Sequence, residues 1–269
     1  MEKIKKLLKA LSLLIGNPSL VNNITNSSYA WSKYLKENHK PLIQLPVVKI
    51  NQLIPDFDET LNVFSFLGGS SLPTDIILLK ALSAQIKNCL YFEIGTWRGE
   101  SVINVSDTAK ECYTLNLSKE EMSQMKLPKK YIDLHGFFSK KKENITQLYG
   151  NSLNYDFGAL NKKFDLIFID GNHKYEFIKN DTEKVFKHLI HDNSIVVWHD
   201  YATDPETMRP EVLSGILDGI PDKYKKNIYH VSNTLCAIFM KGEIESYNFD
   251  YPTIPNKSFK ITVKSRTIS

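Results

Sequence analysis

The sequence predicts an α/β fold, a doubly wound parallel sheet with helices on both faces and an N-terminal accessory helical region. From residue 89 onward, short apolar segments of strand length alternate with longer segments of helical period. The segment 164–170, FDLIFID, is apolar almost throughout, as a strand covered on both faces must be. Strands that alternate with helices require right-handed crossovers, which place the helices on the two faces of one sheet.

The chain divides into three predicted parts. Residues 1–67 hold helical segments and a proline-punctuated stretch, and form the accessory region. Residues 68–242 carry the alternating pattern and form the main domain, entered through a flexible joint at 67–71, LGGSS. Residues 243–269 are polar with scattered aromatics, and we expect an extended tail that wraps the domain.

The N-terminal segment places lysines beside leucines at helical spacing, which predicts a helix ended by Gly16 and Pro18. Lys9 interrupts the apolar run and no small-residue cleavage site follows, which argues against a signal peptide. The helix can pack on the protein's own core, or it can lie on a membrane surface as a basic amphipathic helix. We expect the packed helix.

The main domain is expected to begin with a helix, because Pro73 and Thr74 are helix-start signals. Apolar residues recur at helical spacing in the first three predicted helices, which gives each one a buried face. The predicted helices span 72–88, 99–110, 175–190 and 210–220. The predicted strands span 89–94, 112–117, 145–151, 164–170, 194–200, 226–232 and 234–241.

Composition excludes several classes of protein. The net charge is only +4 and the basic residues are spread along the chain, so we expect no nucleic-acid partner. No segment approaches the roughly 18 consecutive apolar residues of a membrane span. Cys89, Cys112 and Cys236 lie far apart without metal-ligand spacing. They predict buried thiols in a reducing, cytoplasmic environment, and neither disulfides nor a zinc site.

The stretch 91–104, YFEIGTWRGESVIN, predicts a bare turn between a strand and a helix. An apolar run reaches Glu93, and Gly95 and Gly99 follow, which allows a ligand to approach the backbone and the helix to pack closely on the strand. The dinucleotide fingerprint requires G-x-G-x-x-G, whereas this turn reads G-T-W-R-G. The departure argues against a pyrophosphate cradle.

Polar residues follow three of the predicted strands. They occupy 93–99, 170–173 and 199–200. In an open α/β sheet, ligands bind outside the carboxyl ends of the strands, where the strand order reverses. These residues are therefore expected to converge at one edge of the sheet.

Three segments together, FEIGTWRGES, FDLIFIDGNHKYEFIKNDTEKVFKHLI and SIVVWHDY, resemble the class I S-adenosylmethionine-dependent methyltransferases. The similar branch has an IDG-x-H turn and a following HD pair, and is found among small-molecule and sugar O-methyltransferases. The resemblance covers about residues 73–240. It implies a Rossmann-like sheet, S-adenosylmethionine as cofactor, and O-methylation of a small hydroxylated acceptor such as a sugar.

The resemblance also implies a cofactor site. Relatives have an acidic residue that binds the ribose hydroxyls of the cofactor, and the matching position here is Asn116. Near the adenine of the cofactor, where relatives often have another acid, this sequence has Asn151. An amide can accept one bond and donate another, but the strength of a charge-assisted bond is lost. The implied cofactor residues are Glu93, Gly95, Thr96, Gly99, Asn116, Asn151, Ser152 and Asp170.

The acceptor side of the implied site contains two histidines and two acids. Histidine titrates near neutral pH, so His173 is the predicted general base and His199 a second base or a metal ligand. Metal-dependent relatives imply a divalent ion, Mg or Mn, held by Asp170, His199 and Asp200. Imidazole suits Mn better than Mg. The structural alternative is that Asp170 caps the turn and His199 bonds the backbone.

Two other functions stay open at this point. Asn116 and Asn151 suit a catalytically inactive methyltransferase-like module that serves binding or assembly. An NAD-dependent oxidoreductase is disfavoured by the missing third glycine. The expected partner is a small-molecule acceptor. The sequence leaves open whether the protein forms a homo-oligomer.

Overall fold

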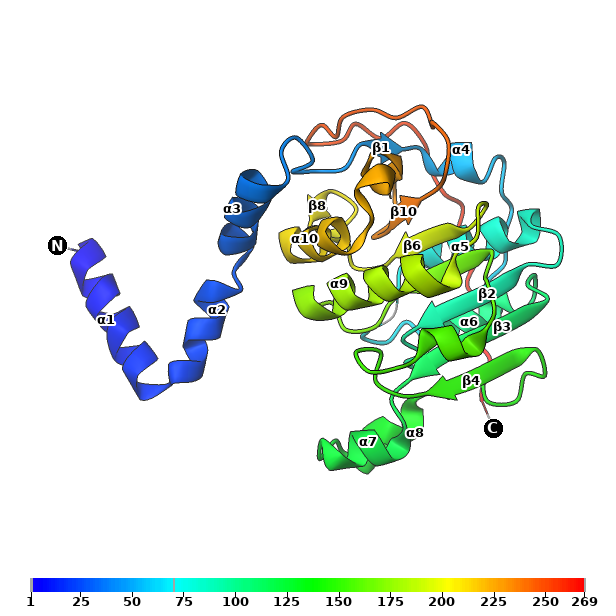
Figure 1. Cartoon of the computed structure of the whole chain (residues 1–269), viewed down its shortest axis with the longest axis horizontal. Coiled ribbons are helices and arrows are strands. Elements are labelled where there is room, and N and C mark those ends of the chain that lie inside the picture. Colours follow the sequence, from blue (N-terminus) through cyan, green and yellow to red (C-terminus); the bar gives the residue numbers. More distant parts are fainter. Residues whose placement is uncertain (1, 70, 269) are drawn as a thin grey trace.

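A sheet of eight strands organises the protein in the computed structural model, which describes residues 2–69 and 71–268 (Figure 1). The spatial order is β1-β9-β10-β6-β5-β2-β3-β4. Only β10 runs antiparallel to its neighbours β9 and β6. The strands are β1 (Val47–Val48), β2 (Leu90–Ile94), β3 (Glu111–Asn116), β4 (Ile145–Tyr149), β5 (Leu166–Ile169), β6 (Ile195–Trp198), β9 (Ile228–Val231) and β10 (Ala237–Phe239).

The predicted doubly wound fold is confirmed by the path of the chain. From β2 it runs outward through β3 to β4, then returns to place β5 on the other side of β2. The strand order therefore reverses between β2 and β5, which is where open α/β sheets bind ligands. Ile94 pairs with both Leu115 and Ile169, and Ile169 pairs with Trp198. The ends of four parallel strands are thus level at one edge.

Each face of the sheet is covered by helices because successive strand residues alternate between two cores. Ile167 and Ile169 of β5 join the core under α9 and α10, while Leu166 and Phe168 join the core under α5 and α6. This alternation explains why the strand is apolar throughout. The covering helices are α5 (Pro73–Gln85), α6 (Glu100–Val105), α9 (Tyr175–Lys184, continued by a π-helical turn over Val185–Leu189) and α10 (Pro210–Gly219).

Several short elements were not predicted. They are α4 (Ile50–Leu53), α7 (Lys119–Gln124), α8 (Lys129–Leu134), the 3-10 turns Phe157–Leu160 and Asp222–Asn227, and the hairpin of β7 (Ala202–Asp204) with β8 (Thr207–Met208). Strand β1 was missed because its two residues form a strand only by pairing with β9. No described helix is long and apolar enough to cross a membrane, and all three cysteines are buried free thiols.

The expectation that the N-terminal helix packs on the core is wrong. Helix α1 (Glu2–Gly16) ends where Gly16 and Pro18 predicted, but it has no buried residue. A 3-10 turn (Pro18–Leu20) and α2 (Val21–Thr25) follow, also without buried residues. Both helices lie away from the sheet and its covering helices (Figure 1). Helical periodicity gives α1 an apolar face, but no other described residue buries it.

Helix α3 (Ser28–Asn38) is the first N-terminal element that packs on the domain. Its Tyr34 hydroxyl donates to Asp218 of α10 at 2.7 Å, and the Tyr175 hydroxyl of α9 donates to the same carboxylate at 2.6 Å. Trp31 stacks on Tyr175, with ring centroids 4.8 Å apart. These contacts fix α3 against the first residue of α9.

The glycine-rich joint is held where the structure describes it. Arg98 donates to the backbone carbonyls of Gly68 at 3.0 Å and Leu67 at 3.4 Å. The flexibility expected of the joint stays a prediction, and Ser70 lies outside the described residues. At the other end of the chain, Tyr247 and Val47 exchange two backbone hydrogen bonds, which ties the start of the predicted tail to the edge strand.

The two glycines of the β2–α6 turn are required by the protein's own packing. Gly95 has φ +99°, and a Cβ built on it would lie 2.0 Å from the backbone oxygen of Asp170. Gly99 has φ +81°, and a Cβ there would lie 2.7 Å from Ser139 Oγ. The bare backbone of Gly95 lies directly against the end of β5, so this glycine serves the packing of the protein itself.

Gly95→Ala should therefore destabilise the fold itself. Gly242→Ala is the matched control, since Gly242 has φ +101° but no atom within 4 Å of its built Cβ. We expect Gly95→Ala to lower the free energy of unfolding by about 2 kcal/mol or more beyond the control, because backbone atoms must move. Urea denaturation of both variants measures this difference, and equal losses would contradict it.

Candidate functional site

Four side chains meet where β5 and β6 end. Asp170 follows β5, His173 lies in the next turn, and His199 and Asp200 follow β6. His199 Nδ1 lies 3.1 Å from Asp170 Oδ1 and 3.5 Å from Asp200 Oδ2. His173 Nδ1 lies 3.3 Å from the same Asp200 Oδ2. The structure thus brings together the residues predicted for the acceptor side, which we call the edge cluster.

A fifth residue, Asp75 of α5, holds His199 from inside the protein. Asp75 Oδ2 lies 3.1 Å from His199 Nε2, and the side chain of Asp75 is fully buried. The backbone amides of Leu72 and Leu235 donate to its two oxygens at 2.7 and 2.8 Å. Sequence reasoning missed Asp75, because an acid in the first turn of a helix is usually explained by the helix alone.

The charges of the edge cluster are strongly coupled. Burial alone would lower the pKa of His199, but Asp170, Asp200 and Asp75 raise it well above its ordinary value. Burial would raise the pKa of Asp200, yet the contacts with His173 and His199 hold it well below the usual range. The pKa of Asp170 is raised, chiefly by burial. The three carboxylates around His199 therefore favour its protonated form.

Asp200 adopts an unfavourable backbone conformation. Its φ of +56° lies in the left-handed region, which is uncommon for a residue with a side chain. Arg209, at the start of α10, donates to Asp200 Oδ1 at 2.8 Å. The other oxygen, Oδ2, faces the two histidines. Arg209 was not predicted, because its contact with Asp200 depends on the β7–β8 hairpin between them.

The edge cluster fits a divalent metal ion. One ligand atom each from Asp170, His199 and Asp200 lies within 4.8 Å of the others. Nδ1 of His199 is buried, and within the described chain no aligned hydrogen bond satisfies it. Its other nitrogen faces the Asp75 carboxylate, as a metal-bound histidine usually does. Two carboxylates and one imidazole suit Mn²⁺ better than Mg²⁺.

Glu93 and Thr96, two of the predicted cofactor residues, lie at the end of β2. Glu93 is fully buried, and its carboxylate accepts hydrogen bonds from the hydroxyls of Tyr91, Ser101 and Thr114 at 2.8, 2.6 and 2.8 Å. Burial raises the pKa of Glu93 to about 7, although these hydrogen bonds lower it. The Thr96 hydroxyl is also engaged, 2.6 Å from that of Thr114. Glu93 and Thr96 therefore support the turn from beneath.

Asn116 lies at the carboxyl end of β3, beside the glycine turn. Its amide nitrogen donates to the Leu117 carbonyl at 3.2 Å. Among residues 2–69 and 71–268, no group donates to Asn116 Oδ1, so this oxygen is available to a ligand hydroxyl. The available amide oxygen fits the ribose role that the resemblance implies, and a bound ribose stays a prediction.

Asn151 and Ser152 follow β4 in a tight turn. Asn151 Oδ1 accepts from the Leu153 amide at 3.0 Å, and the Ser152 carbonyl accepts from Asn180 and Lys184 of α9. These bonds fix the loop against α9, where Asp181 is buried. Burial is the largest of several effects on the pKa of Asp181, and it raises this pKa to about 6. A role for Asn151 and Ser152 at the adenine of a bound cofactor stays a prediction.

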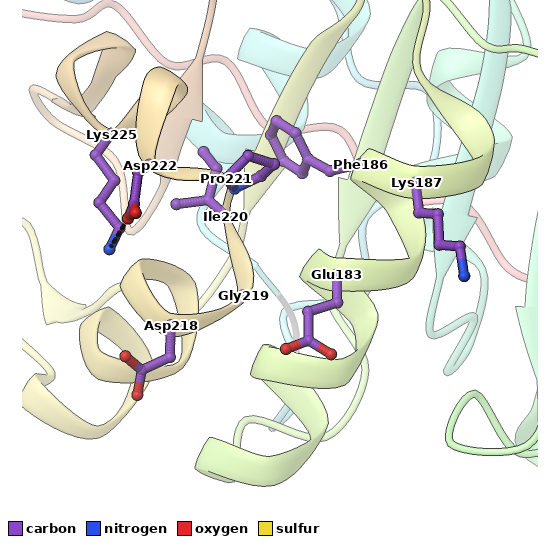
Figure 2. Close-up of a pocket in the computed structure, with 9 residues that line it drawn as sticks. All are labelled: Glu183, Phe186, Lys187, Asp218, Gly219, Ile220, Pro221, Asp222 and Lys225. Atoms are coloured by element: carbon purple, nitrogen blue, oxygen red, sulfur yellow. Dashed lines mark ion pairs between the residues drawn. The ribbon is translucent and has the colours of Figure 1, made fainter.

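A surface hollow of about 460 Å³ lies elsewhere (Figure 2). It is bounded by the end of α9, the π-helical turn after it, the end of α10 and the residues that follow α10. Helix α9 starts at the carboxyl edge of the sheet and runs back, so its last residues lie at the opposite edge. The hollow contains no residue of the edge cluster. The edge cluster groups two histidines with two acids, and it is therefore the candidate functional site. The lining residues are Glu183, Phe186, Lys187, Asp218, Gly219, Ile220, Pro221, Asp222 and Lys225.

Residues 92–201 match the family model described as methyltransferase domain, and this range spans β2 to the end of the edge cluster. No curated protein matches the sequence. Among solved structures, the chain is similar to an SAH-bound methyltransferase from Podospora anserina. The identity is 17%, the TM-score is 0.46, and the match covers 64% of this chain and 80% of that one.

Two further solved structures are similar at comparable levels. An O-methyltransferase from Bacillus cereus in complex with SAH has 16% identity and a TM-score of 0.43, with 80% of this chain and 100% of that one covered. An O-methyltransferase from Streptomyces achromogenes, involved in tomaymycin synthesis, has 15% identity and a TM-score of 0.40, with 61% and 78% covered.

The raised pKa of Glu93 makes stability depend on pH in a specific way. The folded carboxyl has a pKa of about 7, against an ordinary value of 4.5, so the folded state holds the proton more tightly than the unfolded state. The contribution to stability is complete below pH 4.5 and is lost as pH rises to about 7.

Glu93→Gln should remove this loss. The free energy of unfolding of the variant, relative to wild type, should rise by about 3 kcal/mol between these two pH values and then stay level. Urea denaturation at a series of pH values measures how the difference in unfolding free energy between the two proteins changes with pH. A constant effect of the new amide on stability does not alter this change. Parallel pH curves for the two proteins would contradict the assignment.

Proposed function

We propose that this chain, an S-adenosylmethionine-dependent methyltransferase with its methyltransferase domain at residues 92–201, methylates a hydroxyl oxygen of a small acceptor. The observation that carries the proposal is the edge cluster, where His173 and His199 share the Asp200 carboxylate at the ends of β5 and β6. When bound, the cofactor supplies a methyl group on a sulfonium, which an oxygen nucleophile accepts by direct displacement.

His173 is placed to remove the acceptor proton. Its side chain is about half exposed, whereas His199 is buried. A proton on His173 Nδ1 that is donated to Asp200 leaves the lone pair of Nε2 free, and this is the atom that a general base needs. Arg209 holds the other oxygen of Asp200, so the carboxylate orients the ring without moving. The hydroxyl proton of the acceptor then passes to His173 Nε2.

Asp170, His199 and Asp200 would hold the divalent ion, with Asp75 orienting His199 from behind. A bound ion would lower the pKa of an acceptor hydroxyl and so assist its deprotonation. His173, which lies beside this set without belonging to it, keeps its role as base with or without an ion. A sugar is the acceptor class that the sequence resemblance suggests.

A second candidate function rests on the two neutral amides. The sequence resemblance implies that Asn116 and Asn151 replace charged acceptors of active relatives, which suits a module that binds without catalysis. Cofactor affinity separates this candidate from an enzyme. The methyltransferase-domain match replaces the NAD-dependent oxidoreductase alternative.

Turnover should depend on His173. The wild-type chain is incubated with S-adenosylmethionine, Mn²⁺ and a panel of free sugars, nucleotide sugars and catechols, and the S-adenosylhomocysteine formed is measured. His173→Ala should lower turnover by about 10²-fold to 10⁴-fold, the usual contribution of a general base. Calorimetric affinity for S-adenosylhomocysteine should not change.

His188→Ala is the matched control, because His188 lies in the π-helical turn near the opposite edge of the sheet. It should leave both quantities unchanged. Full turnover in His173→Ala would contradict its role as base, and a loss of S-adenosylhomocysteine affinity would make it a cofactor contact instead.

Restoring a charge at the end of β3 should tighten cofactor binding. Asn116→Asp replaces a neutral acceptor by a carboxylate, and we expect about fivefold higher affinity for S-adenosylmethionine, or about 1 kcal/mol. Asn154→Asp adds the same charge on an exposed residue of the loop after β4 and should have no effect. Calorimetry on wild type, Asn116→Asp and Asn154→Asp measures these affinities. Unchanged affinity in Asn116→Asp would contradict the ribose assignment.

A further inference from the structure

Helix α1 presents an apolar face that the rest of the described chain leaves uncovered. Leu7 and Leu8 are each 60% exposed, and Ile15 is 81% exposed. By the 3.6-residue period, the apolar residues fall within an arc of roughly 120° on one side of the helix. Within a single globular domain such a face would be buried, but here it lies in solvent (Figure 1). The residues of this apolar face are Ile4, Leu7, Leu8, Leu11, Leu14 and Ile15.

The remaining surface of α1 is basic. Lys5, Lys6 and Lys9 project from the side opposite the apolar face, and Lys3 lies at its border. The only acid in the helix, Glu2, pairs with Lys6 at 3.0 Å. The helix therefore combines a continuous apolar face with a positively charged one.

We infer that α1 is an interfacial anchor, which binds the surface of an anionic lipid bilayer with its apolar face in the acyl boundary. Lysines on the polar face and leucines on the other are the composition of helices that lie in the plane of a membrane interface. Anionic headgroups complement the lysines at the same time as the acyl chains cover the leucines.

A second copy of the chain fits this face less well. Pairing two α1 helices would bury the apolar faces but bring Lys3, which borders them, close to the lysines of the other copy. Glu2 is the only acid within helix α1, and it already pairs with Lys6. An anionic surface removes this repulsion.

The anchor would be connected to the catalytic domain through α3. Trp31 and Tyr34 of α3 contact Tyr175, which follows His173 by two residues. The attachment point of the N-terminal helices is thus close to the edge of the sheet that carries the edge cluster. Membrane binding by α1 does not depend on the proposed methyl acceptor.

Flotation with lipid vesicles tests the inference on the full chain. Wild type should float with vesicles of equimolar phosphatidylglycerol and phosphatidylcholine, and not with pure phosphatidylcholine. Each of Lys5→Gln, Lys6→Gln and Lys9→Gln should weaken binding by about fivefold, as expected for one lysine at an anionic surface. High salt should weaken it as well.

The apolar face has a matched control within the same helix. Leu8→Gln with Leu11→Gln should abolish flotation, while Leu13→Gln should not, because Leu13 is 55% exposed but projects from the basic side. Glutamine is a good helix former, so all these variants keep the helix.

Failure of the wild type to float with anionic vesicles would overturn the inference, as would equal losses in Leu13→Gln and the double variant. Dimerisation without lipid that the double variant abolishes, measured by sedimentation, would also overturn it. That result would show that a second copy covers the face.

Discussion

The contact between His199 and three carboxylates is the constraint on which the site depends. The imidazole lies between the fully buried Asp75 of α5 and the two acids that end β5 and β6. It therefore joins one covering helix to the ends of β5 and β6. A buried ion pair is stable only while both partners stay in place, so removing one of these side chains would leave a buried polar partner uncompensated. The same arrangement presents Nδ1 of His199 beside two carboxylates, where a metal ion could replace its proton.

The glycine turn after β2 completes this edge of the sheet. Gly95 lets the β2–α6 turn pass directly against the backbone of Asp170, so the predicted cofactor side and acceptor side are in contact. Glu93 holds the turn from beneath through three hydroxyl groups, at the cost of a buried carboxyl whose pKa rises to about 7. The two halves of the site are therefore parts of one packed unit.

The sequence was sufficient for the central strands and for the convergence of Asp170, His173, His199 and Asp200. Apolar runs followed by polar residues identify the carboxyl ends of parallel strands, and topology brings those ends together. Asp75 could not be predicted in the same way, because its partner His199 is 124 residues away and α5 approaches it only in the folded protein. Helical periodicity likewise identified the apolar face of α1, but periodicity does not say what covers a face.

A crystal structure with S-adenosylhomocysteine and Mn²⁺ would test the central claim most directly. The account predicts the cofactor product over the ends of β2 and β3, with its ribose at Asn116 and its sulfur facing the edge cluster. It also predicts an anomalous scattering peak between Asp170, His199 and Asp200. Cofactor product bound in the hollow near α10, or bound at β2 with its sulfur facing away from His173, would contradict the account.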